Sequence, residues 1–444
     1  MFLDIIRYSY FLYSLYRVSK TKNEENINRL IKSTKKCGVL ATKLLQFILM
    51  RGNELNDSRL HYVFEDCDKH SFEYTQQVYL EEFGKDIFND YIIENTDPIA
   101  SGSIGQVYKF YSKLLNTHVA IKVKHPKLNE RVIHFIKVIK VVCFLCKWFN
   151  KYHYMIIEYI DNIQKQLDYI EEAENTIKFR YKWKSEKSII IPEVFEYTDN
   201  FIIMEYHEGK NYNELPDDKK LIVSLYMNFI FYTSFLIHDF VHGDLHTGNW
   251  KVICEGDQLQ IILYDCGIMC STNDFEYNKK MICNLFGGSF ENLLYLVSNK
   301  DHGHSEIRKC KKIIENLHEL SAGESLRVFI DTVLSMKLIS NKKSINVLNA
   351  FAIIAEIYRP AADTFNKYTK DSNDYQIIMY FYLGILRNLK LFDELYVFLD
   401  NWMKSDAVHE KIYSDWLFEL LGHKNGHILD TIVYRKIFKN NQLL

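Results

Sequence analysis

The segment from His242 to Asn249, which reads HGDLHTGN, constrains this chain more than any other stretch. It follows an apolar run of helical character at Leu225–Phe240. After it comes a short apolar stretch, Leu259–Leu263, which predicts a strand that ends just before Asp265. A carboxylate in a loop, an amide a few residues later and a second carboxylate after a strand are the groups that phosphoryl transfer requires.

Each polar residue of this region has an expected role. In phosphoryl transfer one carboxylate orients or deprotonates the attacking oxygen, while an amide and another carboxylate hold Mg²⁺ on the phosphates. The order along the chain therefore predicts Asp244 as the base or water-orienting group, and Asn249 and Asp265 as the Mg²⁺ ligands. We expect His242 and His246 to brace the loop rather than to do chemistry.

A turn of small residues near position 100 predicts a nucleotide-binding loop. Residues 98–107 read PIASGSIGQV, and the two glycines let the backbone close over phosphates without an obstructing Cβ atom. The strand predicted at Val119–Val123 carries Lys122, whose ammonium would contact the α- and β-phosphates. A hinge predicted at residues 204–209 would meet adenine through its backbone. The candidate nucleotide-binding residues are Ala100, Ser101, Gly102, Ser103, Gly105, Val107, Lys122, Glu205 and Tyr206.

A lysine near a nucleotide needs a carboxylate to hold it in place, and the predicted helix over 154–184 supplies several. We expect Glu172 to be this partner, with Glu174 as the second choice and Glu171 on a solvated face. Asp244, Lys122 and Glu172 are therefore the predicted catalytic set, with ATP and Mg²⁺ as cofactors.

The composition predicts a folded and mostly helical protein. Lys and Arg number 55 against 57 Asp and Glu, and this balance gives no argument for a nucleic-acid partner. Hydrophobic residues make up 48% of the 444 residues, enough for a sizeable core. The 17 glycines and 5 prolines are few, which favours long helices over turn-rich β architecture.

Cysteine usage and the N-terminal sequence predict an intracellular protein in a reducing compartment. Nine cysteines lack metal-ligand spacing, and the chain begins with neither a signal peptide nor a clear transit peptide. No stretch reaches the roughly 18 uninterrupted apolar residues of a membrane span. The apolar run 1–18 could lie on a membrane surface, as a peripheral contact, or pack on the protein's own core, and we expect core packing.

The predicted elements divide the chain into three parts. Residues 1–95 form a helical extension, with helices predicted at Glu24–Met50, Phe72–Phe83 and Gly84–Ile93. Residues 96–205 contain the predicted strands and the nucleotide loop, and residues 206–444 form a largely helical part with the catalytic and metal loops.

Taken together, these motifs resemble the UbiB/AarF-type atypical kinases, a family linked to coenzyme Q and other isoprenoid-lipid metabolism. The loop at 98–107 is similar to that family's alanine-rich nucleotide loop, and 119–126 to its strand with the nucleotide lysine. Residues 166–180 resemble its αC helix, and 240–249 with 265–267 its catalytic and metal loops. The resemblance covers about residues 30–300. It implies an α+β, bilobal protein kinase-like fold with a small β-sheet N-lobe, a large helical C-lobe and a helical N-terminal extension.

Four features depart from the family pattern. The family's N-terminal lysine–x–glycine–glutamine signature appears as Lys43-Leu44-Leu45-Gln46, and its acidic pair begins with Gln166 and leaves Asp168 alone. Gly102 replaces the usual alanine, and the loops read HGD and DCG where HAD and DFG are commoner. The changes at Leu45, Gln166 and Gly102 suggest, as a hypothesis, a relaxed selectivity lid and more ordinary handling of ATP.

Three functions remain open from the sequence. The first is a UbiB-type ATPase or kinase whose substrate is a small or lipid-linked molecule rather than a protein. The second is a soluble small-molecule kinase of the aminoglycoside or choline kinase type, which shares the HGD string. The third is a nucleotide-binding pseudokinase that serves as a scaffold. The complete set of ionic residues weighs against the third, and the N-terminal extension favours the first over the second.

Overall fold

The computed structural model describes five stretches of the chain: residues 2–45, 69–145, 160–281, 290–298 and 308–355. Within these stretches the positions left out are 39, 43, 103, 161, 185, 217, 218, 221, 222, 225, 226, 228, 229, 232, 256, 257, 275, 276, 279, 309, 311, 313–321, 337 and 339–343. The predicted residues Lys43, Gln46 and Ser103 therefore lie outside the described part. Among the residues described, no helix is both long and apolar enough to span a bilayer.

The described chain forms two compact units. The first comprises Met1–Lys178, Pro192–His207 and Asp265–Ile268, and the second comprises Phe179–Ile191, Glu208–Tyr264 and Met269–Leu444. The domain boundaries predicted at residues 95 and 205 stay predictions.

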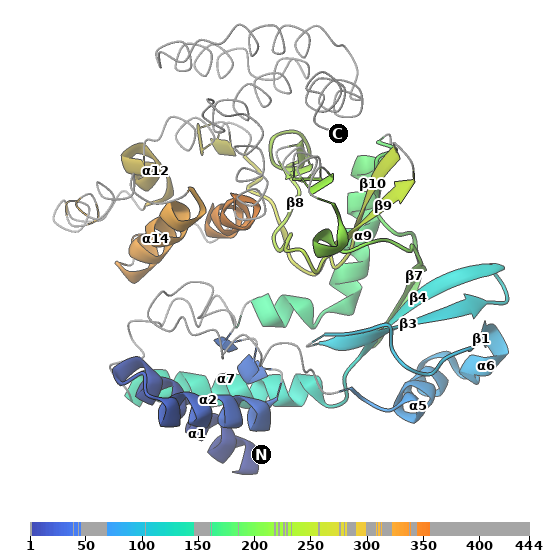
Figure 1. Ribbon diagram of the computed structural model, residues 1–444, viewed down its shortest axis with the longest axis horizontal. Coiled ribbons are helices and arrows are strands. Elements are labelled where there is room, and N and C mark those ends of the chain that lie inside the picture. Colours follow the sequence, from blue (N-terminus) through green and yellow to red (C-terminus); the bar gives the residue numbers. More distant parts are fainter. Residues whose placement is uncertain are drawn as a thin grey trace, which may run out of the picture. The chain divides into compact units, whose positions relative to one another are not determined.

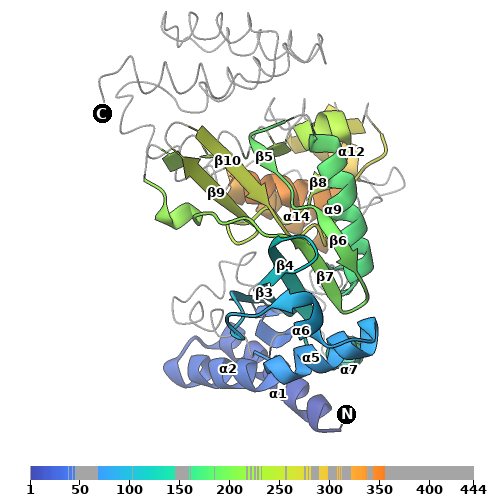
Figure 2. The same cartoon turned by 90° about the vertical axis from the view of Figure 1, so that its right-hand side faces the viewer.

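An antiparallel sheet forms the centre of the first unit (Figure 2). Its strands follow the order β1-β3-β4-β7-β6, and β2 pairs with β3 beside this path. Strand β4 alternates in burial, so that Val119, Ile121 and Val123 face one side while Lys122 and Lys124 face the other. The bounds are β1 Tyr91–Ile92, β2 Ala100–Ser101, β3 Gly105–Ser112, β4 Thr117–Lys124, β6 Val194–Tyr197 and β7 Phe201–Glu205.

Two helices cover the apolar side of this sheet. Helix α5 (Phe72–Phe83) begins at the capping hydroxyl of Ser71 and ends at Gly84, whose φ of 68° is left-handed. The helix predicted at Gly84–Ile93 is wrong over most of its length: α6 spans only Ile87–Asp90, and β1 follows at once. Tyr91 and Ile92 pair their backbone with β3 in the sheet instead of continuing the helix, so their backbone groups are still satisfied.

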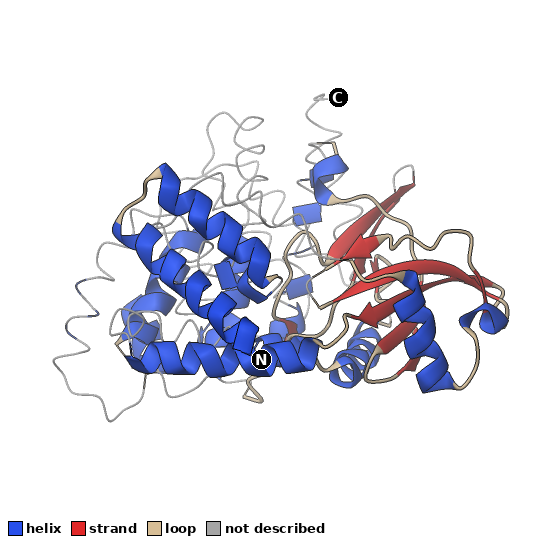
Figure 3. Ribbon diagram, turned by 90° about the horizontal axis from the view of Figure 1, so that it is seen from below, coloured by secondary structure: helices blue, strands red, loops and turns tan. Residues whose placement is uncertain are grey.

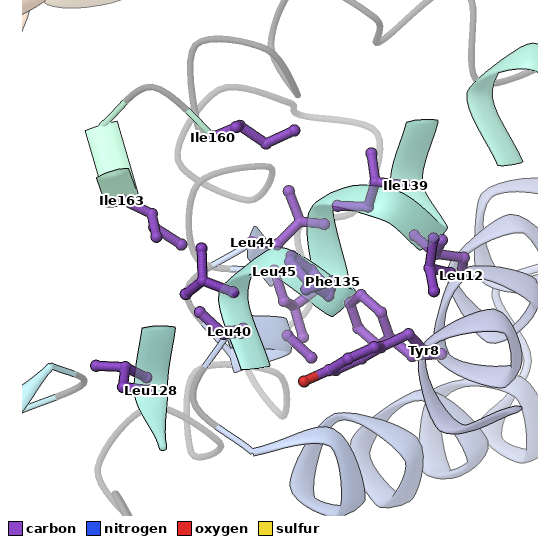
Figure 4. Close-up of a cluster of buried hydrophobic side chains, with 14 of the residues drawn as sticks. Tyr8, Leu12, Leu40, Leu44, Leu45, Leu128, Phe135, Ile139, Ile160 and Ile163 are labelled. Carbon is purple, nitrogen blue, oxygen red and sulfur yellow. The ribbon is translucent and has the colours of Figure 1, made fainter. Parts of the chain in front are cut away.

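The N-terminal helices pack beside α7 (Leu128–Leu145), as Figures 1 and 3 show. Helix α1 spans Phe2–Lys20 and α2 spans Glu24–Cys37. The core packing expected for residues 1–18 is found on one side of α1, where the ring of Tyr8 meets that of Phe135 edge-on at 4.8 Å. Leu45 is fully buried in the same cluster (Figure 4). This cluster extends to Ile104 in the nucleotide loop, so the loop and the N-terminal helices share one core.

Helix α9 (Tyr169–Trp183) supplies side chains to the site. It begins later than the helix predicted at 154–184, because the carboxylate of Asp168 accepts a hydrogen bond from the backbone N–H of Glu171 at 2.9 Å and caps a new helix there. The lone acidic residue of the altered family motif thus has a local structural role.

The second unit combines small sheets with helices. Strand β10 (Gln258–Leu263) pairs antiparallel with β9 (Trp250–Glu255) and parallel with β5 (Ile189–Ile190). A two-stranded ribbon joins β8 (Val241–His242) to β11 (Met269–Cys270). The helices named in this unit are α12 (Phe290–Val297) and α14 (Ala322–Ser335), with short turns at Tyr212–Glu214 and Ser234–His238. The small antiparallel sheet of the first unit and the mixed, helix-rich second unit confirm the predicted α+β kinase-like fold.

Candidate functional site

The predicted nucleotide loop is a tight connection between β2 and β3. The backbone N–H of Gly102 donates to the carbonyl of Gly105 at 2.9 Å, which closes the turn. A Cβ atom on Gly105 would clash with the Tyr169 hydroxyl and the Val123 carbonyl, whereas one on Gly102 would meet only an ordinary contact at 3.6 Å. Gly105 is therefore required by space and Gly102 is not.

Among the residues that the structure describes, two buried hydroxyls beside this loop have no hydrogen-bond partner. They are Ser101 Oγ in β2 and the Tyr169 hydroxyl at the start of α9. A buried polar group without a partner costs free energy, so native structures retain such groups mainly where a ligand or water completes them. These two hydroxyls beside the glycine-containing loop fit an anionic, hydrogen-bonding ligand such as a nucleotide.

Lys122 and Glu172 form an ion pair beneath the loop. The ammonium of Lys122 lies 2.6 Å and 2.7 Å from the two carboxylate oxygens of Glu172. Asp265 Oδ1 lies 3.6 Å from the same ammonium. Glu171 and Glu174, the neighbouring acidic residues, are exposed. The structure thus brings together three of the predicted site residues from a strand, a helix and a loop.

Burial and charge act in opposite directions on this pair. Burial alone would lower the pKa of Lys122, but the carboxylates of Asp265 and Glu172 outweigh it and raise that pKa above the ordinary range. Burial raises the pKa of Glu172 to about 7, and the Lys122 ammonium limits the rise. Lys122 therefore remains a cation at neutral pH and is available to an anion.

Tyr169 is a site residue that the sequence reasoning missed. Its ring centre lies 5.1 Å from the Lys122 ammonium and 4.8 Å from that of Lys124. Two lysines spaced by two on one strand share a face, and a residue three before Glu172 on a helix lies on the same side as Glu172. These two periodicities are the signal that could have found Tyr169.

The predicted hinge residues end β7 in the first unit. The backbone N–H of Glu205 donates to the carbonyl of Glu193 at 2.8 Å, and its carboxylate lies 3.0 Å from His207 Nε2. The Tyr206 ring faces the Lys109 ammonium at 4.5 Å. Since the Glu205 N–H is used by the sheet, a bound adenine would need other backbone groups of this segment.

Asp265 has a strained backbone. Its φ of 54° is left-handed, a conformation that non-glycine residues adopt mainly where the surrounding structure enforces it. Asn175 in α9 donates to the carbonyl of Cys266 at 3.2 Å, and a Cβ atom on Gly267 would lie only 3.3 Å from Oδ1 of Asp265. These contacts hold the carboxylate of Asp265 beside Lys122 while its side chain stays about one-third exposed.

The HGDLHTGN segment forms a hydrogen-bonded loop in the second unit. The fully buried His242 accepts the Asp244 backbone N–H at Nδ1 (3.2 Å), while its Nε2 donates to the carbonyl of Tyr264 at 2.9 Å. The side-chain amide of Asn249 donates to the carbonyl of Asp244 at 2.8 Å. This leaves Oδ1 of Asn249 as the atom that would take a metal ion.

His246 packs within the same loop. Its Nδ1 accepts the backbone N–H of Gly248 at 3.0 Å, and its Nε2 lies 3.7 Å from the Asp244 carboxylate. The predicted site residues thus fall into two sets, each ordered within its own unit. Lys122, Glu172 and Asp265 form the first set, and Asp244 and Asn249 form the second.

Comparison with known proteins agrees with these motifs. The family model described as the ABC1 atypical kinase-like domain matches residues 62–292, more than half of the chain. The predicted resemblance to the UbiB/AarF-type atypical kinases is thereby confirmed.

Three relatives illustrate the similarity. An uncharacterised aarF domain-containing protein kinase of Arabidopsis thaliana, described as chloroplastic, is 29% identical over 39% of this chain and 25% of its own length. A probable protein kinase UbiB of Blochmanniella pennsylvanica is 28% identical over 40% of this chain and 35% of its own. A putative ABC transporter of Paramecium bursaria Chlorella virus 1 is 24% identical over 78% of this chain and 75% of its own. The chain thus spans about a quarter to a third of the first two relatives.

Proposed function

The chain belongs to the ABC1 atypical kinase-like family, and from this premise we propose that it binds MgATP and transfers or hydrolyses the terminal phosphoryl group. The observation that carries the proposal is the buried Lys122–Glu172 pair with Asp265 3.6 Å from the Lys122 ammonium. A cation held by one carboxylate beside a second, partly exposed carboxylate is an arrangement suited to phosphates and their metal ion.

Each site residue has a role in this proposal. Lys122 would neutralise the α- and β-phosphates, and Glu172 would fix the position of Lys122. The loop at Gly102–Gly105 would cover the phosphates, with Ser101 donating its hydroxyl. Asp265 and Asn249 would hold Mg²⁺, which when bound neutralises phosphate charge. Asp244 would orient the attacking oxygen and accept its proton.

The decisive experiment is ATP hydrolysis by the full chain with Mg²⁺, beside Asp265→Asn and Lys122→Met. We expect turnover that falls at least about a hundredfold in both variants, since each removes a charge used in the transition state. Asp274→Asn, a loop carboxylate of the second unit, is the matched control and should leave turnover unchanged. Turnover that persists in Asp265→Asn would refute the proposal, whereas Asp265-dependent nucleotide binding without turnover would favour the pseudokinase alternative.

We further propose that the phosphoryl acceptor is a small or lipid-linked molecule that the protein reaches at a membrane surface. This agrees with the link of the UbiB/AarF-type family to isoprenoid-lipid metabolism. Support comes from α1, whose outer side carries the exposed apolar residues Leu3, Ile6, Tyr10 and Tyr13 at helical spacing. The exposed cations near this stripe are Arg7, Arg17 and Lys20. Apolar and aromatic side chains bordered by cations suit the interface of an anionic bilayer.

A reducing intracellular compartment completes the proposal. The cysteines whose side chains the structure describes are free thiols: Cys37, Cys254, Cys266, Cys270 and Cys310. Burial raises the pKa of the Cys266 thiol, next to Asp265, to about 12. Such a thiol is inert and packs as a small apolar side chain.

A further inference from the structure

A chain of hydrogen bonds connects the nucleotide loop to the segment before α5. His125, directly after β4, contacts the loop twice: its backbone N–H donates to the carbonyl of Ile104 at 2.9 Å, and its Nε2 lies 3.0 Å from the carbonyl oxygen of Gly102. Nδ1 of His125 lies 2.8 Å from Nδ1 of His70. Nε2 of His70 lies 3.0 Å from the Thr75 hydroxyl.

The carbonyl at the loop end fixes the direction of these bonds. Because a carbonyl oxygen only accepts, a neutral His125 carries its proton on Nε2, and its Nδ1 accepts from His70. His70 therefore carries its own proton on Nδ1, and its Nε2 accepts from Thr75. Burial, together with the nearby His125, lowers the pKa of His70 to about 4, so His70 is neutral at pH 7.

The series of hydrogen bonds ends, on the side away from the loop, at buried residues that bond to one another. The Thr75 hydroxyl lies 3.0 Å from that of Tyr108, which in turn accepts from Nε2 of Gln106. Gln106 also clamps the backbone of His70, donating to its carbonyl and accepting from its N–H, both at 3.1 Å. Thr75, Gln106 and Tyr108 are fully buried, so a broken link would leave an unsatisfied polar group in the interior.

We propose that His70 and His125 are positioning residues that hold the nucleotide loop in its binding conformation. Gly102 has little conformational restraint of its own. Its carbonyl is tethered to His125 on the protein side, which keeps that oxygen from turning toward a phosphate that it would repel. His70 fixes the tautomer and orientation of His125, as a partner group does for a metal-bound or catalytic imidazole. This inference rests on the proposed nucleotide-binding function.

Two matched pairs of variants test the inference in the full chain. An asparagine amide reaches about as far as Nδ1 of histidine, and a glutamine amide about as far as Nε2. His70→Asn therefore keeps the hydrogen bond to His125 and loses the one to Thr75. His70→Gln keeps the hydrogen bond to Thr75 and loses the one to His125. His125→Gln keeps the bond to Gly102, and His125→Ala removes it. The His70 pair differs by one methylene, so a merely structural role would not separate its members in this direction.

The first readout is amide hydrogen exchange of peptides covering residues 99–107 in the nucleotide-free protein. We expect faster exchange in His70→Gln and His125→Ala, and near wild-type exchange in His70→Asn. His125→Gln keeps the bond to Gly102 but loses the bond to His70, so its exchange should lie between wild type and His125→Ala. The second readout is binding of the non-hydrolysable analogue AMP-PNP with Mg²⁺. We expect binding about tenfold weaker in His70→Gln and His125→Ala, the effect of about one hydrogen bond, and within about twofold of wild type in His70→Asn.

The outcomes separate the inference from the proposed function. Equal exchange in His70→Asn and His70→Gln, or in His125→Ala and His125→Gln, would overturn the inference whether or not nucleotide binds. A wild-type protein that binds no AMP-PNP would overturn the proposed function, while the exchange comparison still decides the role of the two histidines. If His125→Ala fails to fold, the His70 pair alone is sufficient.

Discussion

Gly105 and Tyr169 lie so close that the helix α9 hydroxyl occupies the space where any side chain at position 105 would begin. The same tyrosine ring faces the ammonium groups of Lys122 and Lys124. The loop, the strand that carries Lys122 and the helix that carries Glu172 therefore meet at one residue. A change at Gly105 must displace either Tyr169 or the backbone of Val123.

We predict that Gly105→Ala weakens AMP-PNP binding at least about tenfold, because the added methyl group pushes Tyr169 or the loop out of place. Gly102→Ala is the matched control, since its Cβ would meet only the Gly105 carbonyl at 3.6 Å. It should bind within about twofold of wild type. Isothermal titration calorimetry measures both. Equal loss in the two variants would show that loop flexibility, rather than the Tyr169 contact, is what matters.

The net contribution of the Lys122–Glu172 pair to stability should be smaller than the destabilisation caused by removing one of its two partners. We expect Glu172→Leu to destabilise the first unit by about 3–5 kcal/mol, because it leaves a buried ammonium without its partner. The double variant Lys122→Met/Glu172→Leu should recover most of this loss, to within about 1–2 kcal/mol of wild type, while remaining inactive. Urea unfolding gives the free energies, with Glu171→Gln on the exposed side as control. Additive losses would contradict a coupled pair.

Stability should depend on pH through His70. Its pKa is lowered from 6.5 to about 4 in the folded protein, so the unfolded chain binds the extra proton more readily. The stabilisation is fully present above about pH 6.5 and is lost as the pH falls through about 4. Titratable groups around His70 are His125, Tyr74 in α5 and Tyr108 in β3. Unfolding midpoints at pH 7 and pH 4.5 should differ less in His70→Asn than in wild type, whereas His118→Asn, on the same strand as Lys122, should behave as wild type.

Membrane contact should depend on the outer side of α1. The variant Ile6→Asp/Tyr10→Ser should bind anionic liposomes at least about tenfold more weakly, because it places polar groups on the exposed apolar stripe. Leu114→Ser is the control: this residue is 90% exposed, in the turn after β3, and is not part of the stripe. Co-sedimentation with liposomes measures the bound fraction. Unchanged binding by the α1 variant would remove the support for a membrane-bound acceptor.

The sequence was enough to predict the charged residues of the candidate site, but not the residues and strand that surround them. Lys122, Glu172 and Asp265 were identified because charged residues at the spacing of a known motif are conspicuous. Tyr169 was missed because aromatic residues are common here, 15% of the chain, so its residue type alone did not single it out. His70 was missed because its partner His125 is far away along the chain, and only the folded sheet brings the two rings together. The strand β1 was predicted as helix because two residues carry no periodicity, and pairing with β3 decided the outcome.

The shared core of the N-terminal helices and the nucleotide loop limits how this protein can be dissected. Tyr8, Leu45 and Ile104 belong to one apolar cluster with Tyr169 and Ala173 of α9. A deletion of residues 1–95, the simplest way to test the role of the helical extension, would also remove α5, α6 and strand β1 from the sheet. Such a fragment would expose the apolar side of the loop to water. Its inactivity would therefore report the loss of packing against the N-terminal helices, and not the loss of a regulatory element. Inherited variation should follow the same division, with changes on the inner side of α1 compensated by changes in α7 or α9.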